Sequence, residues 1–312
     1  MNQATGARRR VVDLLMLTGK SLWLGFLEFY DSDNLTYAAS IGYYALLSLF
    51  PFSMLALGAL GRAAADEADR REVLEFVLRY FPKQFEFITN QLDAFRSESV
   101  ALGVVGTITL VWGALGVFGA ITTAVNYAWR VEKNRNYWHQ KLFSFLMMLV
   151  AGALLLVALL LVSARGVVGA SWFAEVLYRF PGLLVLRGLA LTWAPTLLFI
   201  LVVGLIFYFV PNTKVHFREV WIGAFITGLL WKGALQLFAW YMADMSRFTR
   251  VNGSIAAVVV FLGWVYLQAV ILLYGVEFTA AFARLRKLQK DEAKKAAAAA
   301  APAGGQTTAA AN

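Results

Sequence analysis

The sequence of 312 residues contains no cysteine and only two histidines. The absence of cysteine excludes disulfides, thiolate nucleophiles and cysteine-ligated metal sites. No group of histidine and acidic residues has the spacing of metal ligands, and neither a glycine-rich phosphate loop nor a nucleophile elbow is present in the sequence. The sequence therefore predicts no catalytic residue, no metal and no other cofactor.

Charged residues are also scarce, since they make up 15% of the chain while hydrophobic residues make up 60%. About a quarter of the residues in a soluble domain are charged, so this composition is typical of a membrane protein. Five uncharged runs exceed the ~20 residues that a helix needs to cross a bilayer, and a sixth contains a single charge, Lys232. We predict an all-α integral membrane protein with six transmembrane helices, over about residues 36–61, 100–125, 142–164, 188–210, 220–243 and 254–280.

The formal net charge of +9 is unevenly distributed along the chain. Basic residues gather before the first predicted span, after the second, after the fourth and after the sixth, and a six-span topology puts these segments on one side. The excess of Lys and Arg places that side, with both termini, in the cytoplasm. Orientation and attraction to anionic lipids therefore explain the basic charge, and we expect no nucleic-acid partner.

Three of the segments outside the predicted spans have a pattern of their own. Residues 1–33 form a cytoplasmic segment whose apolar positions recur at helical spacing, which predicts an amphipathic helix lying on the membrane surface. The first external connection, Arg62–Glu98, has two apolar stripes separated by Pro82 and is predicted to be a helical hairpin. Residues 284–312 are basic and then Ala-rich, and we expect a disordered cytoplasmic tail after a membrane domain of residues 34–283.

Lys232 is the strongest candidate for a functional residue. It lies about 19 Å from the start of the apolar run at residues 220–243, near the middle of a bilayer. A charge at that depth costs roughly 2.5–3.5 kcal/mol and usually marks function. Ala224 and Gly228 share its helix face, where another helix can approach closely, so we expect Lys232 to face protein or a water-filled cavity. The alternative is a structural charge that snorkels or pairs with a carbonyl.

Two further groups of residues are predicted to complete a cavity around Lys232. Ser48 and the kinks expected at Pro51 and Pro195 would shape it, because proline removes a backbone hydrogen bond from a helix. Gln236 and Gln268 would hydrogen-bond an anionic headgroup.

Glu277 is an acidic residue in the last apolar segment, near its cytoplasmic end. One interpretation is a proton or counter-ion site at the mouth of the cavity. The other is a helix-end salt bridge with Arg284 or with an arginine from a loop.

His139 and His216 are both predicted on the cytoplasmic side, next to basic residues. Two imidazoles could in principle cleave RNA by acid–base catalysis, so a membrane-tethered ribonuclease is a third hypothesis. Tyr137 and Trp138 beside His139 resemble an interfacial aromatic belt, which explains that position without catalysis.

Three segments together resemble a known family: "AASIGYYALLSLFPF", "YFVPNTKVHFREVWIGAFITGLLWKGALQLFAWYM" and "NGSIAAVVVFLGWVYLQAVILLYGVEFTAAF". Over residues 34–282 the chain is similar to the YihY/BrkB family of bacterial inner-membrane proteins. The resemblance implies six spans in the cytoplasmic membrane, a link to serum resistance and, under an older label, to ribonuclease BN. Asn126 joins the candidate substrate-binding residues as one of the matching positions, which are Tyr44, Ser48, Pro51, Asn126, Pro211, Asn212, Gly223, Gly253, Ser254, Trp264, Gly275 and Glu277.

The leading hypothesis is an inner-membrane transporter or flippase-like protein for an amphiphilic, anionic lipid or envelope precursor. Its partners would be membrane lipids, and faces of small residues allow a homo-oligomer without requiring one. The alternative is a non-transporting structural or assembly protein of the cell envelope, with envelope-assembly partners. The two differ at Lys232, which a transporter would surround with a wet cavity and a scaffold would bury against carbonyls.

Overall fold

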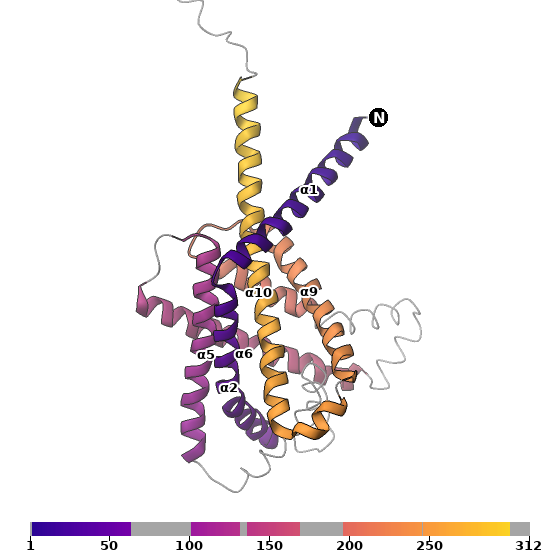
Figure 1. The fold of residues 1–312 in the computed structure, drawn as a ribbon. Helices are drawn as coiled ribbons and strands as arrows, with labels where there is room; N and C mark the ends of the chain where they lie inside the picture. Colours follow the sequence, from indigo (N-terminus) through magenta and orange to yellow (C-terminus); the bar gives the residue numbers. More distant parts are fainter. Residues whose placement is uncertain (1, 64–100, 132–135, 169–195, 245, 300–312) are drawn as a thin grey trace, which may run out of the picture.

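The computed structural model describes residues 2–63, 101–131, 136–168, 196–244 and 246–299 (Figure 1). Every regular element in these ranges is a helix, which confirms the all-α prediction for the described residues. The helices are α1 (Asn2–Asp31), α2 (Asn34–Ala63), α5 (Ala101–Ala128), α6 (Tyr137–Val168), a shorter apolar helix (Thr196–Phe209), α9 (Phe217–Asp244) and α10 (Ser246–Ala299).

Three helices in the described ranges are long and apolar enough to cross a membrane: Gly106–Ala128, Phe217–Tyr241 and Val258–Ala296. Helices α2 and α6 lie at two further predicted spans, and the 196–209 helix at the remaining one. That all six cross the membrane stays a prediction. Residues 64–98 of the predicted external hairpin, and Pro195, lie outside the described residues.

Helix α10 extends well beyond the predicted end of the membrane domain at residue 283. It continues to Ala299, so residues 284–299 of the predicted disordered tail are helical. Alanine, lysine, arginine and glutamine are among the best helix formers, and this stretch is rich in them.

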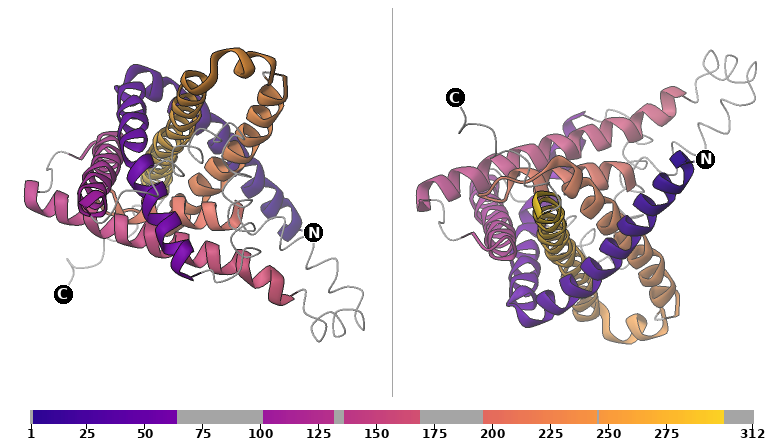
Figure 2. Two further views of the ribbon diagram at one scale, coloured as in Figure 1. Left: turned by 90° about the horizontal axis from the view of Figure 1, so that it is seen from below. Right: turned by 90° about the horizontal axis from the view of Figure 1, so that it is seen from above.

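Helices α2, α5, α9 and α10 form the body of the molecule, and α6 crosses this body at a steep angle (Figures 1 and 2). Helix α1 and the C-terminal part of α10 project from one end. Buried apolar side chains from α2, α5, the 196–209 helix, α9 and α10 meet in one core, among them Ala38, Val125, Phe207, Val220 and Leu273. Because α6 crosses obliquely, its N-terminal part reaches this core through Met147.

Glycine and threonine alternate at the contact between α9 and α10. A Cβ at Gly223 would meet the Thr279 side chain, and a Cβ at Gly275 would meet that of Thr227. Each threonine hydroxyl donates to a carbonyl of its own helix, Thr227 to Gly223 at 2.8 Å and Thr279 to Gly275 at 2.6 Å. This pairing brings two apolar helices close without leaving a hydroxyl unsatisfied.

Helix α1 packs one face against α10. Leu17 belongs to one buried cluster with Phe278 and Phe282, and a Cβ at Gly25 would lie 2.9 Å from the Cα of Phe278. Large apolar residues on other faces of α1, including Leu15 and Trp23, are exposed. An amphipathic helix is consistent with this distribution, and its position on a membrane surface stays a prediction.

Candidate functional site

The residues predicted around Lys232 are only partly brought together. Lys232 lies half-buried on α9, while Gln236, one turn later, is exposed. Gln268 lies on α10, where its amide nitrogen and oxygen are both buried and accept or donate no hydrogen bond within the described residues. Gln268 is therefore not hydrogen-bonded to Lys232 or Gln236. The packing of Phe238 of α9 on Trp264 of α10, with ring centroids 4.4 Å apart, joins the two helices in this region.

Ser48 lies at the contact between α2 and α5. Its hydroxyl donates to the carbonyl of Ala45 at 3.0 Å, and a Cβ at Gly113 of α5 would lie 3.0 Å from the Ser48 Cβ. Helix α2 continues through Pro51. A kink at Pro51 stays a prediction.

Asn126 and Glu277 hold the ends of other elements in place. Asn126 is 7% exposed, and its Oδ1 accepts a hydrogen bond from the backbone N–H of Asn212 at 2.9 Å. Glu277 is 3% exposed, and its Oε1 accepts a hydrogen bond from Nδ2 of Asn34 at 2.8 Å. These bonds link the end of α5 to the loop before α9, and the start of α2 to α10.

An ion-pair cluster lies near these two residues. The Glu28 carboxylate of α1 pairs with Arg130, at 3.1 Å, and with Arg284 of α10. Arg284 also donates to the carbonyl of Ala128, at the end of α5, at 3.1 Å. The helix-end acid that pairs with Arg284 is therefore Glu28 and not Glu277. We call the end of the molecule that carries Glu28, Arg130, Glu277 and Arg284 the charged end.

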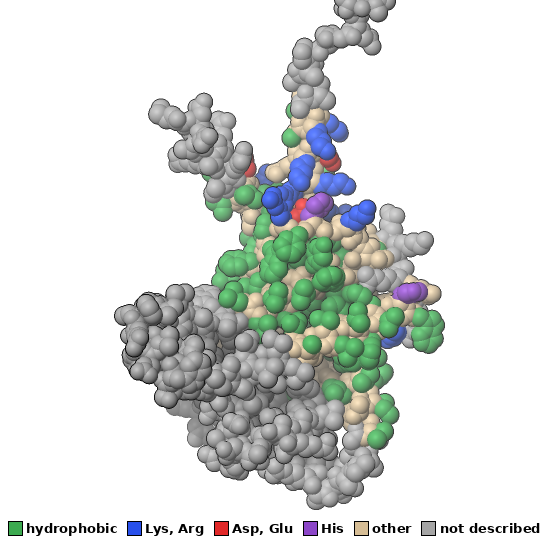
Figure 3. All heavy atoms as spheres, turned by 180° about the vertical axis from the view of Figure 1, so that it is seen from behind, with side chains coloured by type: hydrophobic (Ala, Val, Ile, Leu, Met, Phe, Trp, Pro, Cys, Tyr) green, Lys and Arg blue, Asp and Glu red, His purple; other side chains and the backbone are tan. Residues whose placement is uncertain are grey.

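Figure 3 shows how charged and hydrophobic side chains are distributed on one face of the molecule. Lys and Arg side chains gather where α10 leaves the body, and hydrophobic side chains cover the face below them. Helix ends that are distant in the sequence therefore meet at one basic face. That the basic connections share one side of a membrane stays a prediction.

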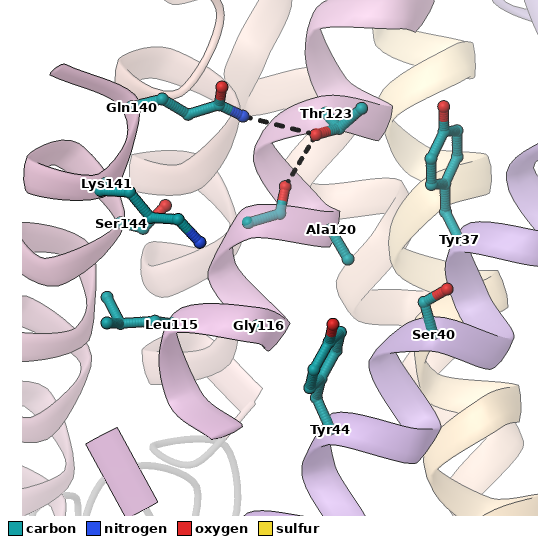
Figure 4. A pocket seen from close by; sticks show the side chains of 11 residues that line it. Tyr37, Ser40, Tyr44, Leu115, Gly116, Ala120, Thr123, Gln140, Lys141 and Ser144 are labelled. Atoms are coloured by element: carbon teal, nitrogen blue, oxygen red, sulfur yellow. Dashed lines mark hydrogen bonds between the residues drawn. The ribbon is translucent and has the colours of Figure 1, made fainter. Parts of the chain in front are cut away.

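A pocket of about 320 Å³ lies between α2, α5 and α6, and none of the residues predicted around Lys232 lines it. Figure 4 shows residues of α6 on one side, residues of α2 on the other, and α5 between them. The lining residues are Tyr37, Ser40, Tyr44, Leu115, Gly116, Gly119, Ala120, Thr123, Gln140, Lys141 and Ser144.

Two glycines of α5 shape this pocket in different ways. A Cβ at Gly116 would lie within 2.6 Å of three ring atoms of Tyr44, so the ring occupies the space that a side chain would take. A Cβ at Gly119 would meet nothing within 4 Å, so this glycine borders open space. The pocket therefore exists because α5 presents small residues where α2 and α6 approach it.

Polar groups are concentrated at the outer part of the pocket. Thr123 lies five residues, or about 8 Å, from the end of α5 at the charged end, while Gly116 lies about 18 Å from it. Gln140 Nε2 is 3.5 Å from the Thr123 hydroxyl, which itself donates to the carbonyl of Gly119 at 3.0 Å. Lys141 is exposed at this rim. The deeper wall consists of Leu115, Gly116, Ala120 and the Tyr44 ring.

The pocket residues of α6 were predictable in part. Gln140 and Ser144 are four residues apart and Lys141 and Ser144 three, so all three lie on one helix face. In the sequence, Lys141 is one of the basic residues after the second predicted span, and its charge there indicates only the orientation of the chain. The small residues of α5 gave a further signal, but the crossing of α6 that encloses the pocket leaves no mark in the local sequence.

Comparison with known proteins identifies the family. The protein family described as virulence factor BrkB matches residues 26–301 of the chain. A UPF0761 membrane protein of Aeromonas salmonicida is 28% identical over 265 residues, 84% of this chain and 89% of that protein. The ribonuclease-like protein YfkH of Bacillus subtilis is 30% identical over 260 residues, 80% of this chain and 90% of that protein.

A UPF0761 membrane protein of Alkalilimnicola ehrlichii is 29% identical over 247 residues, 79% of this chain but 54% of that protein, so this chain spans about half the length of that relative. No solved structure matches the chain. The matches confirm the resemblance inferred from the sequence. The chain is thus an integral membrane protein and belongs to the virulence factor BrkB family.

Proposed function

We propose that this protein is a transporter or flippase-like protein of the bacterial inner membrane, with both termini in the cytoplasm, that moves an anionic amphiphile. The pocket between α2, α5 and α6 is the observation that carries the proposal. Its rim offers Lys141 and an amide, and its deeper wall is apolar and aromatic. An amphiphile presents the same two chemistries in the same order, a polar headgroup followed by hydrocarbon.

The substrate would make a second contact with the protein near the middle of the membrane. Lys232 would attract the headgroup there. Gln268 supports this idea, because both polar atoms of its amide are buried and make no hydrogen bond within the described residues. A buried amide that lacks partners is costly, and a substrate headgroup would supply them.

Lipid translocation in proteoliposomes tests the proposal. Fluorescently headgroup-labelled phosphatidylglycerol and phosphatidylcholine are compared in vesicles with and without protein, and a membrane-impermeant quencher reports which leaflet each lipid occupies. We expect protein to accelerate movement of phosphatidylglycerol more than of phosphatidylcholine. Lys232→Gln should slow this movement. Equal rates with and without protein would overturn the proposal and favour the structural or assembly protein.

A pocket-filling substitution makes the test specific. Gly119→Leu adds a side chain to open space in the pocket and is expected to slow translocation. Gly152→Leu is the matched control, because Gly152 is exposed on α6, has nothing within 4 Å of its Cβ position, and does not line the pocket. Equal effects of the two substitutions on translocation would show that transport does not depend on the pocket.

We also propose that the chain is not an enzyme, although one relative is named as ribonuclease-like. His139 precedes the pocket residues of α6 and His216 precedes α9, and both are exposed. His216 lies 3.8 Å from Glu219, which Arg286 also approaches to 3.8 Å, an arrangement that a helix-end charge cluster explains. RNA cleavage by purified protein that is lost in the His139→Ala, His216→Ala double variant would overturn this part of the proposal.

A further inference from the structure

We propose that the pocket between α2, α5 and α6 binds a phosphate group, with Lys141 and Ser144 as its principal contacts. This inference rests on the proposed function, in which the phosphate belongs to the headgroup of a lipid. It adds the chemical class of the ligand and the residues that recognise it.

The charge of the lining selects an anion. Lys141 is the one charged residue among the residues that line the pocket, and no acidic residue accompanies it. Its position in the second turn of α6 puts the ammonium at the rim, where Figure 4 shows the side chain directed toward the space between α6 and α5. The lining therefore presents a cation and no carboxylate to a bound group.

Ser144 supplies the independent observation that points to a ligand. The residue is 1% exposed, and its hydroxyl has no hydrogen-bond partner within the described residues. Other buried hydroxyls on the helices of this chain donate to the carbonyl four residues earlier, namely those of Ser21, Thr122, Thr227 and Thr279. Ser144 does not, although it lies on a helix where the same bond would satisfy it. A buried hydroxyl that bypasses this option is available to a bound acceptor.

The arrangement of donors favours phosphate over a carboxylate. Lys141 and Ser144 lie three residues apart on α6, and Gln140 completes the same face with an amide. The Lys141 ammonium and the Ser144 hydroxyl, which come from one helix face, suit a group with several acceptor oxygens. The Gln140 amide donates to the Thr123 hydroxyl at 3.5 Å, and this hydroxyl in turn donates to the Gly119 carbonyl at 3.0 Å.

The size of the pocket and the surface beside it suit a lipid. A volume of about 320 Å³ holds a headgroup but is at the small end of ligand sites, so acyl chains would lie outside. Phe145, one turn after Lys141 on α6, is exposed and offers the acyl chains an apolar surface beside the rim.

Equilibrium binding to the full chain in a neutral detergent tests the inference. The probe is a short-chain phosphatidylglycerol with a fluorophore on its acyl chain, followed by fluorescence anisotropy. The competitors are dihexanoyl phosphatidylglycerol, dihexanoyl phosphatidylcholine and inorganic phosphate. Preference for phosphatidylglycerol identifies the lipid as the source of the phosphate, and equally good competition by inorganic phosphate would support the phosphate site with a free anion as its ligand.

Three substitutions locate the binding site. We expect Lys141→Gln to weaken binding about tenfold or more and Ser144→Ala to weaken it several-fold, as for the loss of a hydrogen bond to a charged group. Lys141→Arg should retain most of the affinity. The control is Lys287→Gln, which removes an exposed lysine of α10 that does not line the pocket and should leave the affinity unchanged.

Two outcomes of the binding experiment would overturn the inference: wild-type affinity in both Lys141→Gln and Ser144→Ala, or equal losses in Lys141→Gln and Lys287→Gln. The outcome for the proposed function is separate. Specific binding without translocation in vesicles would leave the phosphate site standing and overturn transport. Translocation of anionic lipid that is indifferent to Lys141→Gln would support transport and overturn the site.

Discussion

Replacing Gly116 by alanine is expected to disturb both the α2–α5 contact and the pocket. The added Cβ would lie within 2.6 Å of three Tyr44 ring atoms, closer than carbon atoms approach in folded proteins. The Tyr44 ring must therefore move, and it is held by packing against Trp112, with ring centroids 6.0 Å apart. Overpacking of this kind costs about 1–3 kcal/mol.

The helix propensity of alanine acts in the opposite direction. In a helix interior, alanine is about 0.8–1.0 kcal/mol more favourable than glycine, which would conceal part of the clash. Gly119→Ala supplies the matched comparison, because Gly119 is three residues away on the same helix and its Cβ would meet nothing within 4 Å. The difference between the two variants removes the propensity term, and we expect Gly116→Ala to be less stable than Gly119→Ala by about 1–3 kcal/mol.

The free energy of unfolding can be measured by titrating each variant with denaturing detergent in mixed micelles, with tryptophan fluorescence as the signal. The same samples report on the pocket through the binding of short-chain phosphatidylglycerol, which should weaken in Gly116→Ala. Equal stability of the two alanine variants would refute the reasoning, because it would mean that Tyr44 does not occupy the space beside Gly116.

Three other substitutions have defined outcomes. Ser144→Ala should leave the free energy of unfolding unchanged or raise it by about 1–3 kcal/mol, because it removes a buried hydroxyl without a partner; a clear loss of stability in the unfolding titration would contradict this. Glu28→Gln should weaken the attachment of α1 by about 1–2 kcal/mol, since Arg284 and Arg130 lose a partly buried partner, and faster proteolysis within α1 would report it. Asn126→Ala should cost about 1 kcal/mol, since the backbone N–H of Asn212 loses its acceptor, and an unfolding midpoint equal to that of wild type would count against this bond.

The parts of the fold that follow from local physics were predictable from the sequence. A long uncharged run must satisfy its backbone polar groups internally when it lies in lipid, so helices were expected at each run and are present wherever the described residues cover one. The C-terminal segment shows that composition alone did not predict the end of the last helix. The composition predicts disorder from residue 284 onwards, whereas the alanines and basic residues of 284–299 continue α10 as a helix.

The partners of buried polar residues were not predictable in the same way. Glu277 bonds to Asn34, which is 243 positions away, and nothing near Glu277 marks that partner. Its charge suggested a proton or counter-ion site, and its geometry shows a contact that holds the start of α2. The pocket was missed for the same reason, because it depends on how α6 crosses α5 and α2 and not on any one segment.

Lys232 remains the residue for which the sequence makes the clearest functional prediction. That prediction rests on the depth of Lys232 in an apolar run. The packing of α9 and α10 does not extend it, because Gln236 is exposed and Gln268 makes no hydrogen bond to Lys232. The Lys232→Gln variant in the translocation assay is therefore the test of that prediction.

Photocrosslinking of an anionic lipid to the protein in native membranes tests the central claim most directly. A phosphatidylglycerol analogue with a photoreactive group next to its phosphate is activated, and the adducts are located by mass spectrometry. The account predicts adducts on the pocket residues of α2, α5 and α6, which decrease when Lys141 is replaced by glutamine. Adducts confined to outward-facing apolar residues such as Leu149 and Trp240, with none in the pocket, would contradict it.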